Sequence, residues 1–134
     1  MSTLWKNDDE LFAMAKEQLF VALVGDTLDK LGYHHQFLSP HLKPLQNQMV
    51  IIGRAMPVLE ADAFTATSSS PGPLSGKPFG LLFEALDDLR DGEIYIATGS
   101  SFRYALWGGL MSTRALHLKA AGAVLDGYVR DSNE

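Results

Sequence analysis

Apolar residues recur at helical spacing along the first quarter of the chain and predict two consecutive helices. The segment Asn7-Asp8-Asp9-Glu10 places carboxylates at the start of the first one, where acidic groups meet the positive end of the helix dipole. A second helical stretch covers about residues 20–31, and Gly32 closes it. Residues 33–48 contain two prolines and little periodicity, so we expect a connecting loop there.

The middle of the chain contains two strand patterns separated by a helical one. Residues 49–59 are rich in Val and Ile and predict a strand near the centre of a sheet, with Pro57 marking a bend or an edge. Residues 79–89 predict a helix with leucines facing inward, and residues 93–98 alternate as a strand does. Residues 61–78 are rich in Ser, Thr, Pro and Gly. This segment is either a plain loop or a lid over a site, and the lid is the interpretation that we favour.

The final third, residues 105–134, predicts a helix, a buried strand and a charged segment in succession. Trp107-Gly108-Gly109 precedes a helix whose inward face carries Met111, Ala115 and Leu118, and Gly122 is expected to end it. A short apolar run at 123–125 predicts a buried strand, which leads directly to Asp126-Gly127-Tyr128-Val129-Arg130-Asp131. Ligands of α/β sheets commonly lie beyond the carboxyl ends of strands. We therefore expect a site here.

The residues of this region suit a divalent metal and a small carboxylate. A helix N-terminus at Gly108-Gly109 offers backbone N–H groups to an anion, and Arg130 adds a forked anion receptor. Asp131 and Glu134 are hard oxygen donors that could share one Mg²⁺ or Mn²⁺ if the chain turns between them. Each feature also has a purely structural interpretation: a solvated surface ion pair for Arg130 and Asp131, and a turn for the two glycines.

Composition narrows the class of protein. A chain of 134 residues suits a single domain spanning 1–134. The net charge is −5, without a basic cluster, which argues against nucleic acid as a partner. No apolar run approaches the length of a membrane span, there is no cysteine, and the N-terminus lacks the pattern of a signal peptide. We expect a cytoplasmic protein with neither a membrane nor a nucleic acid as partner.

The same residues resemble a known family. The run Trp107-Gly108-Gly109-Leu110-Met111-Ser112-Thr113-Arg114-Ala115, together with the segments 122–124 and 126–131, is similar to the RraA-like proteins, which include 4-hydroxy-4-methyl-2-oxoglutarate aldolases. Twenty residues separate Gly109 from Arg130, and two separate Asp131 from Glu134. This spacing resembles the G-x20-R-D-x2-E/D form of the family's metal-site motif. Segments 25–32 and 50–55 also resemble the family's N-terminal helix and first strand.

The resemblance implies a swivelling β/β/α fold of the α/β class, assembled as a homotrimer or a hexamer with sites at subunit boundaries. It implies a lyase that uses Mg²⁺ or Mn²⁺ to cleave 4-hydroxy-2-oxo acids to pyruvate and a second oxo acid, and that also decarboxylates oxaloacetate. Asp131 would be the metal ligand, with Glu134 as the second one. Arg130 would bind the pyruvyl unit, and the Gly108-Gly109-Leu110-Met111 backbone would hold its carboxylate.

Two departures from the family pattern leave alternatives open. The position of Gly109 is often acidic in the aldolases and helps to hold metal-bound water, a role that Glu134 would take here. Family members also continue well beyond the Arg-Asp pair, so the chain is expected to lack the C-terminal part of the family fold. The alternative function is a non-catalytic RraA-type regulator that binds and inhibits a ribonuclease. A family member that retains only the fold is the third.

Overall fold

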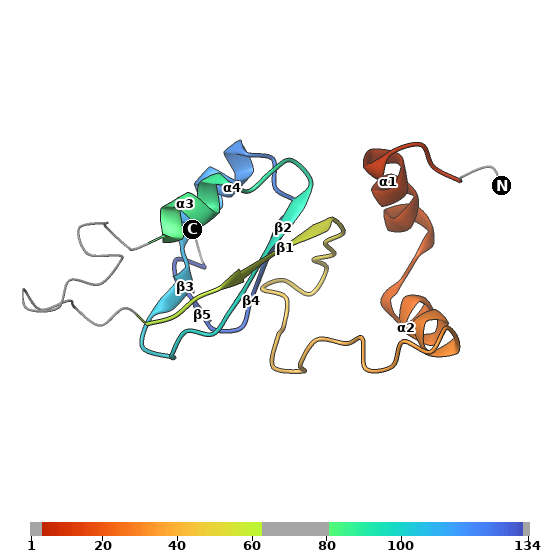
Figure 1. The fold of residues 1–134 in the computed structure, drawn as a ribbon, viewed down its shortest axis with the longest axis horizontal. Helices are drawn as coiled ribbons and strands as arrows, with labels where there is room; N and C mark the ends of the chain where they lie inside the picture. The colour runs from red at the N-terminus through yellow and green to blue at the C-terminus, as the bar shows by residue number, and fades with distance from the viewer. Residues whose placement is uncertain (1–3, 63–80, 133–134) are drawn as a thin grey trace, which may run out of the picture. The chain divides into compact units, whose positions relative to one another are not determined.

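The computed structural model of the chain describes residues 4–62 and 81–132 and contains two compact units, Met1–Gly53 and Arg54–Glu134. The expected lid, residues 61–78, lies almost wholly outside the described residues. Helices and strands are mixed, and the strands are parallel (Figure 1).

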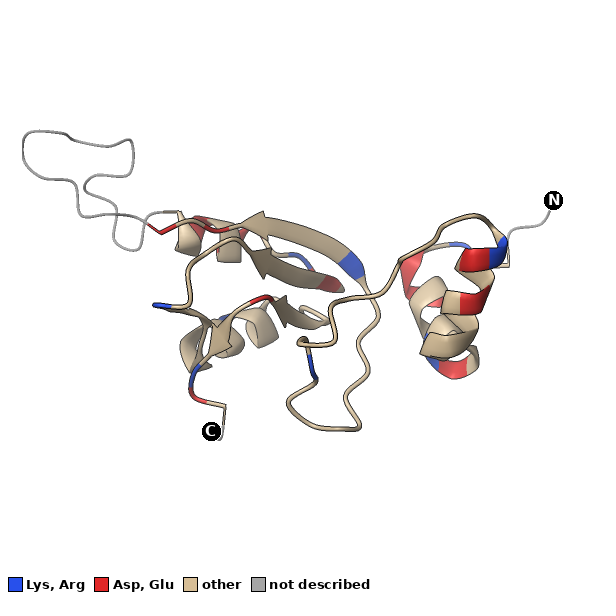
Figure 2. Ribbon diagram, turned by 90° about the horizontal axis from the view of Figure 1, so that it is seen from below, with Lys and Arg blue, Asp and Glu red and all other residues tan. Residues whose placement is uncertain are grey.

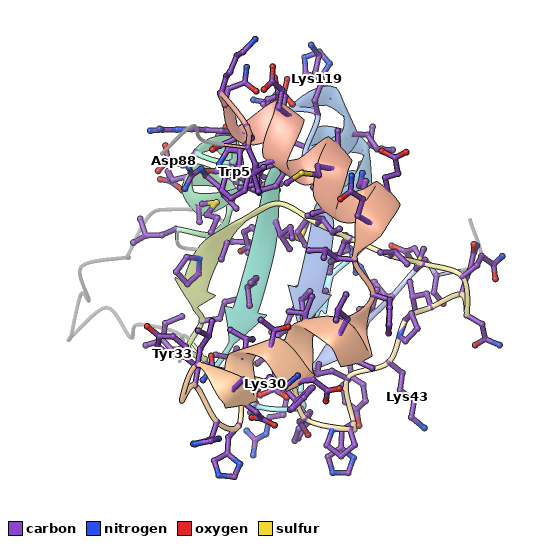
Figure 3. The ribbon with its side chains drawn as sticks, turned by 90° about the vertical axis from the view of Figure 1, so that its right-hand side faces the viewer. Trp5, Lys30, Tyr33, Lys43, Asp88 and Lys119 are labelled. Carbon is purple, nitrogen blue, oxygen red and sulfur yellow. The ribbon has the colours of Figure 1, made fainter. Side chains whose placement is uncertain are left out.

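The first unit holds the two helices that the periodicity predicts, α1 (Asp8–Gln18) and α2 (Val21–Lys30). The Asn7 side chain accepts a hydrogen bond from the Glu10 backbone N–H at 2.9 Å, which caps α1. Gly32 follows α2 with a φ of 85° and ends it, as expected. Figure 3 shows Lys30 on α2 and Tyr33 just beyond it.

The second unit is built on a parallel three-stranded sheet in the order β1-β2-β4, from β1 (Arg54–Leu59), β2 (Glu93–Thr98) and β4 (Gly122–Leu125). Figure 3 shows these strands side by side. Two helices connect them in the chain: α3 (Leu82–Asp87) follows β1, and α4 (Gly109–His117) precedes β4. A second, two-stranded parallel sheet pairs β3 (Ala105–Trp107) with β5 (Tyr128–Val129).

The hydrophobic core of this unit lies between one face of the sheet and the two helices. Tyr95 and Ala97 of β2 are fully or almost fully buried, and their partners in register on β1 and β4 pack against the same cluster. The Tyr95 ring lies 5.1 Å from that of Trp107, tilted by 54°. Burying a side chain of this size contributes about 2 kcal/mol. The other buried members of the cluster come from α3, its C-terminal flank, β3 and α4: Leu86, Leu89, Leu106, Met111 and Ala115.

Three local predictions are wrong. β1 begins at Arg54 rather than at residue 49, and it is an edge strand of the described sheet, because the central position belongs to β2. Pro57 suits this edge, since it has no N–H for a second neighbour. α4 ends at His117, where Lys119 turns the chain with a φ of 60°, so Gly122 begins β4 instead of stopping the helix. The two short strands β3 and β5 were not predicted.

Candidate functional site

The candidate site forms where the end of β5 meets the start of α4. The Arg130 backbone N–H donates to the carbonyl of Trp107 at 3.1 Å, which holds the end of β5 against the end of β3. Asp131 follows in a left-handed conformation with a φ of 61°. Its Oδ2 accepts a hydrogen bond from the Gly109 backbone N–H at 3.1 Å. The structure therefore brings together the predicted metal ligand and the predicted helix N-terminus.

The Arg130 guanidinium lies next to the Asp131 carboxylate. Its Nε is 3.5 Å from Asp131 Oδ2, and Figure 2 shows the basic and acidic residues next to each other near the C-terminal end of the chain. The Arg130 side chain is 70 % exposed and that of Asp131 is 37 % exposed. An ion pair with this exposure contributes less than about 1 kcal/mol to stability. The guanidinium therefore remains accessible to a ligand while it neighbours Asp131.

A side chain at Gly108 would crowd Arg130 and Asp131, whereas the backbone conformation of Gly108 does not itself call for glycine. Its φ of −161° is extended backbone that any residue adopts. A Cβ at this position would lie 2.9 Å from Arg130 Nε and 3.0 Å from Asp131 Oδ2. The missing side chain leaves room for these two groups against the backbone at the start of α4.

The first turn of α4 supplies the N–H groups that the sequence assigned to a substrate carboxylate. Gly108 has no side chain to cap the helix, and the first N–H groups of any helix have no carbonyl partner within it. Of these groups, that of Gly109 is bonded to Asp131. Leu110 is exposed and Met111 is buried in the core. The role of Gly109, Leu110 and Met111 in substrate binding stays a prediction.

One carboxylate at this place, that of Asp131, could contribute to the binding of a lightly coordinated hard cation. Mg²⁺ is commonly bound through one or two carboxylates and keeps several waters, and Asp131 provides one such carboxylate. Within residues 4–62 and 81–132, no group of three or more His, Cys, Asp or Glu side chains gathers in a way that could hold a metal. Glu134, the second expected ligand, lies outside the described residues.

A further polar group, which the sequence analysis did not single out, lies at the carboxyl edge of the parallel sheet. Asp62 follows β1 and accepts hydrogen bonds at 3.0 Å from the Ser100 hydroxyl and from the Ser101 backbone N–H, both after β2. Thr98 donates its hydroxyl proton to Asp126 Oδ2 at 2.9 Å, which joins the ends of β2 and β4. The pairing of parallel strands, which no local pattern reveals, brings these residues together.

Two carboxyl groups at this edge have shifted pKa values. Desolvation by burial raises the pKa of Glu60 above its ordinary value, while a hydrogen bond from Tyr95 opposes the shift. The Tyr95 hydroxyl lies 3.4 Å from Glu60 Oε1. The pKa of Asp62 is lowered, chiefly by hydrogen bonds from the Ser101 side chain and backbone. The hydrogen bonds from Ser100 and Ser101 therefore give the Asp62 carboxylate its partners within the chain.

Two solved structures share the fold of this chain. The chain aligns with a solved structure described as one of several novel cellulases from microbes associated with the gut ecosystem, with a TM-score of 0.75, 24 % identity and 99 % of this chain covered. It also aligns with an uncharacterized protein from Pseudomonas syringae pv. tomato str. DC3000, with a TM-score of 0.68, 20 % identity and 99 % of this chain covered. The chain covers 56 % and 55 % of these two chains. At this identity the likeness is one of fold alone.

A family model matches most of the chain. Residues 21–134 match the RraA-like model, described as Aldolase/RraA. The chain therefore belongs to the RraA-like family, and the expectation of an α/β fold of this kind is confirmed. The comparison with curated proteins finds no match. Among the described residues, none of the helices has both the length and the apolar character that a membrane span needs.

Proposed function

We propose that the protein is a divalent-metal-dependent lyase that cleaves 4-hydroxy-2-oxo acids to pyruvate and a second oxo acid, with oxaloacetate decarboxylation as a side activity. The observation that carries the proposal is the meeting of three groups at one point: the Asp131 carboxylate, the Arg130 guanidinium and the Gly109 backbone N–H. The family includes aldolases as well as regulators, so membership alone is compatible with the proposal.

Each residue has a distinct role in this proposal. Asp131 would hold the metal, which when bound supplies a Lewis acid for the 2-keto oxygen of the substrate. Arg130 would bind the pyruvyl unit and stabilise negative charge that develops on the same oxygen during carbon–carbon cleavage. The first-turn N–H groups of α4 other than that of Gly109, which donates to Asp131, would orient the substrate carboxylate. Aldol cleavage and decarboxylation develop the same charge, so one site would serve both reactions.

Exposed apolar side chains near the site support the oligomer that the family resemblance implies. Leu110, which is next to Gly109, is 84 % exposed. The exposed rings of Phe102 and Tyr128 pack edge to face, with their centroids 5.6 Å apart. Tyr128 lies two residues before Arg130. We propose that a homotrimer or hexamer covers these side chains, and light scattering of the purified chain would test the mass directly.

Release of pyruvate from oxaloacetate tests the function without a guess about the natural substrate. The assay compares the protein with Mg²⁺ or Mn²⁺ against an enzyme-free metal control. We expect metal-dependent turnover that Arg130→Met removes and that Arg90→Met, a change at an exposed arginine of the turn before β2, leaves intact. If neither oxaloacetate nor 4-hydroxy-2-oxo acids are turned over, the proposal fails, and the regulator that binds a ribonuclease becomes the function to test.

A further inference from the structure

The peptide group between Gly108 and Gly109 is held from both sides. Its carbonyl oxygen, on Gly108, accepts hydrogen bonds from the Ser112 backbone N–H at 3.0 Å and from the Ser112 hydroxyl at 3.3 Å. Its N–H, on Gly109, donates to Asp131 Oδ2 at 3.1 Å. Because a trans peptide is planar, with its C=O and N–H pointing in opposite directions, fixing one of them also aims the other.

The direction of the Ser112 hydroxyl is set by Trp107. The indole Nε1–H of Trp107 donates to Ser112 Oγ at 2.8 Å, and an indole N–H can only donate. Ser112 Oγ is therefore the acceptor in that bond, and its single proton is available for the carbonyl of Gly108. Trp107 is itself buried and packs against the fully buried Tyr95. A chain of hydrogen bonds thus runs from the core to the candidate metal ligand.

From this geometry we propose that Ser112 is a positioning residue for Asp131, acting through the Gly108–Gly109 peptide and oriented by the Trp107 indole. The inference rests on the proposed function in one respect: Asp131 is taken to be the residue that binds the metal. Ser112 does not reach the carboxylate itself. Together with the Ser112 backbone N–H, the Ser112 hydroxyl fixes the direction of the Gly109 N–H that donates to Asp131 Oδ2.

The bond from the Ser112 hydroxyl also has a purely structural interpretation. Serine and threonine within helices often bond to the carbonyl four residues earlier with no functional consequence. Thr27 makes such a bond in α2, where its hydroxyl donates to the carbonyl of Leu23 at 2.7 Å. Thr27→Val therefore controls for the loss of a helical hydroxyl, just as Ser112→Ala removes the hydroxyl under test.

The first measurement is the affinity for Mn²⁺, followed by the paramagnetic resonance signal of the free ion. Ser112→Ala is expected to weaken binding roughly tenfold, as the loss of a residue that orients a metal ligand does. Ser112→Thr keeps the hydroxyl and should restore the affinity, and Thr27→Val should leave it unchanged. Unchanged affinity in Ser112→Ala, or no recovery in Ser112→Thr, would overturn the positioning role.

The second measurement does not depend on metal. Hydrogen exchange of the Gly109 amide, followed by NMR, reports the bond to Asp131 directly. We expect exchange to become roughly tenfold faster in Ser112→Ala and to stay the same in Thr27→Val. If the unaltered protein fails to bind Mn²⁺, the proposed function falls. The exchange rate at Gly109 still decides the inference, and an unchanged rate in Ser112→Ala refutes it.

Discussion

The carboxylate of Asp131 accepts a hydrogen bond from the backbone N–H of Gly109 at 3.1 Å, across twenty-two positions of the chain. Asp131 thereby supplies the cap that Gly108, without a side chain, cannot give to α4. The same carboxylate lies beside Arg130. One side chain therefore has a structural task at a helix end and a proposed chemical task at a metal, and substitutions can separate the two.

Asp131→Asn should retain the hydrogen bond that caps α4 and lose the metal-dependent activity. The amide oxygen can still accept from Gly109, but a neutral amide is a much weaker ligand for a hard cation. We expect metal-dependent pyruvate release to disappear while the free energy of unfolding stays within about 0.5 kcal/mol of the original. Asp131→Ala should also lose the activity, and should cost about 1 kcal/mol of stability because the cap is removed. Urea denaturation and the oxaloacetate assay measure both. Full activity in Asp131→Asn would remove the charge of this residue from the mechanism.

Gly108→Ala should disturb the site more than the fold. The new Cβ would come within 3.0 Å of Arg130 Nε and Asp131 Oδ2, both on exposed or half-exposed side chains that can move away. We expect activity to fall at least tenfold, since a displacement of about 1 Å can cost that much. The thermal midpoint should change little. Activity equal to that of the original protein would show that this close approach is not needed.

Gly99→Ala should be clearly more destabilising than Gly92→Ala, although both glycines have a positive φ. Gly99 has a φ of 105°, and an added Cβ would lie 2.6 Å from the carbonyl oxygen of Glu60. Gly92 is the matched control, because its φ is 73° and no atom lies within 4 Å of the added Cβ. We expect about 1–2 kcal/mol for Gly92→Ala and clearly more for Gly99→Ala, measured by urea denaturation. Equal losses would mean that the loop relaxes and the contact with Glu60 costs nothing.

Glu60 should make the unfolding free energy fall as the pH rises. Its pKa is raised in the folded chain from an ordinary value of 4.5, first by desolvation, so the folded state binds the proton more tightly than the unfolded state. The related stability is fully present below pH 4.5 and is lost as the pH rises through the folded pKa. Glu60→Gln keeps an acceptor for Tyr95 and does not ionise.

The expected result for Glu60→Gln is therefore a gain in stability, relative to the original protein, that is larger at pH 7 than at pH 4. Denaturation midpoints at several pH values measure this difference. Asp62 titrates in the opposite sense, because its pKa is lowered by the hydrogen bonds from Ser101. Its contribution is lost mainly as the pH falls below 3.8, and because both proteins contain Asp62 it does not change the difference between them. A difference that shrinks with rising pH would contradict the assignment to Glu60.

Local sequence patterns predicted most of the helices and strands. The carboxylates after Asn7 mark the start of α1, and the alternation at 93–98 marks β2. Patterns of this kind act over one or two turns of chain and are visible without any partner. The prediction failed where pairing between segments distant in the sequence decided the outcome. β3 is only three residues long, and such a segment becomes a strand because β5 pairs with it.

The sequence by itself determined the family, the helical start at Gly109 and the chemical character of Arg130 and Asp131, since these depend on residue type and spacing alone. Only the tertiary structure decided that β1 lies at the edge of the sheet, that Asp131 caps α4, and that Ser112 and Trp107 hold the peptide next to it. The physical reason is distance along the chain. A hydrogen bond between residues twenty-two positions apart exists only after two strands have paired and brought their ends together, and no local pattern encodes which ends will meet.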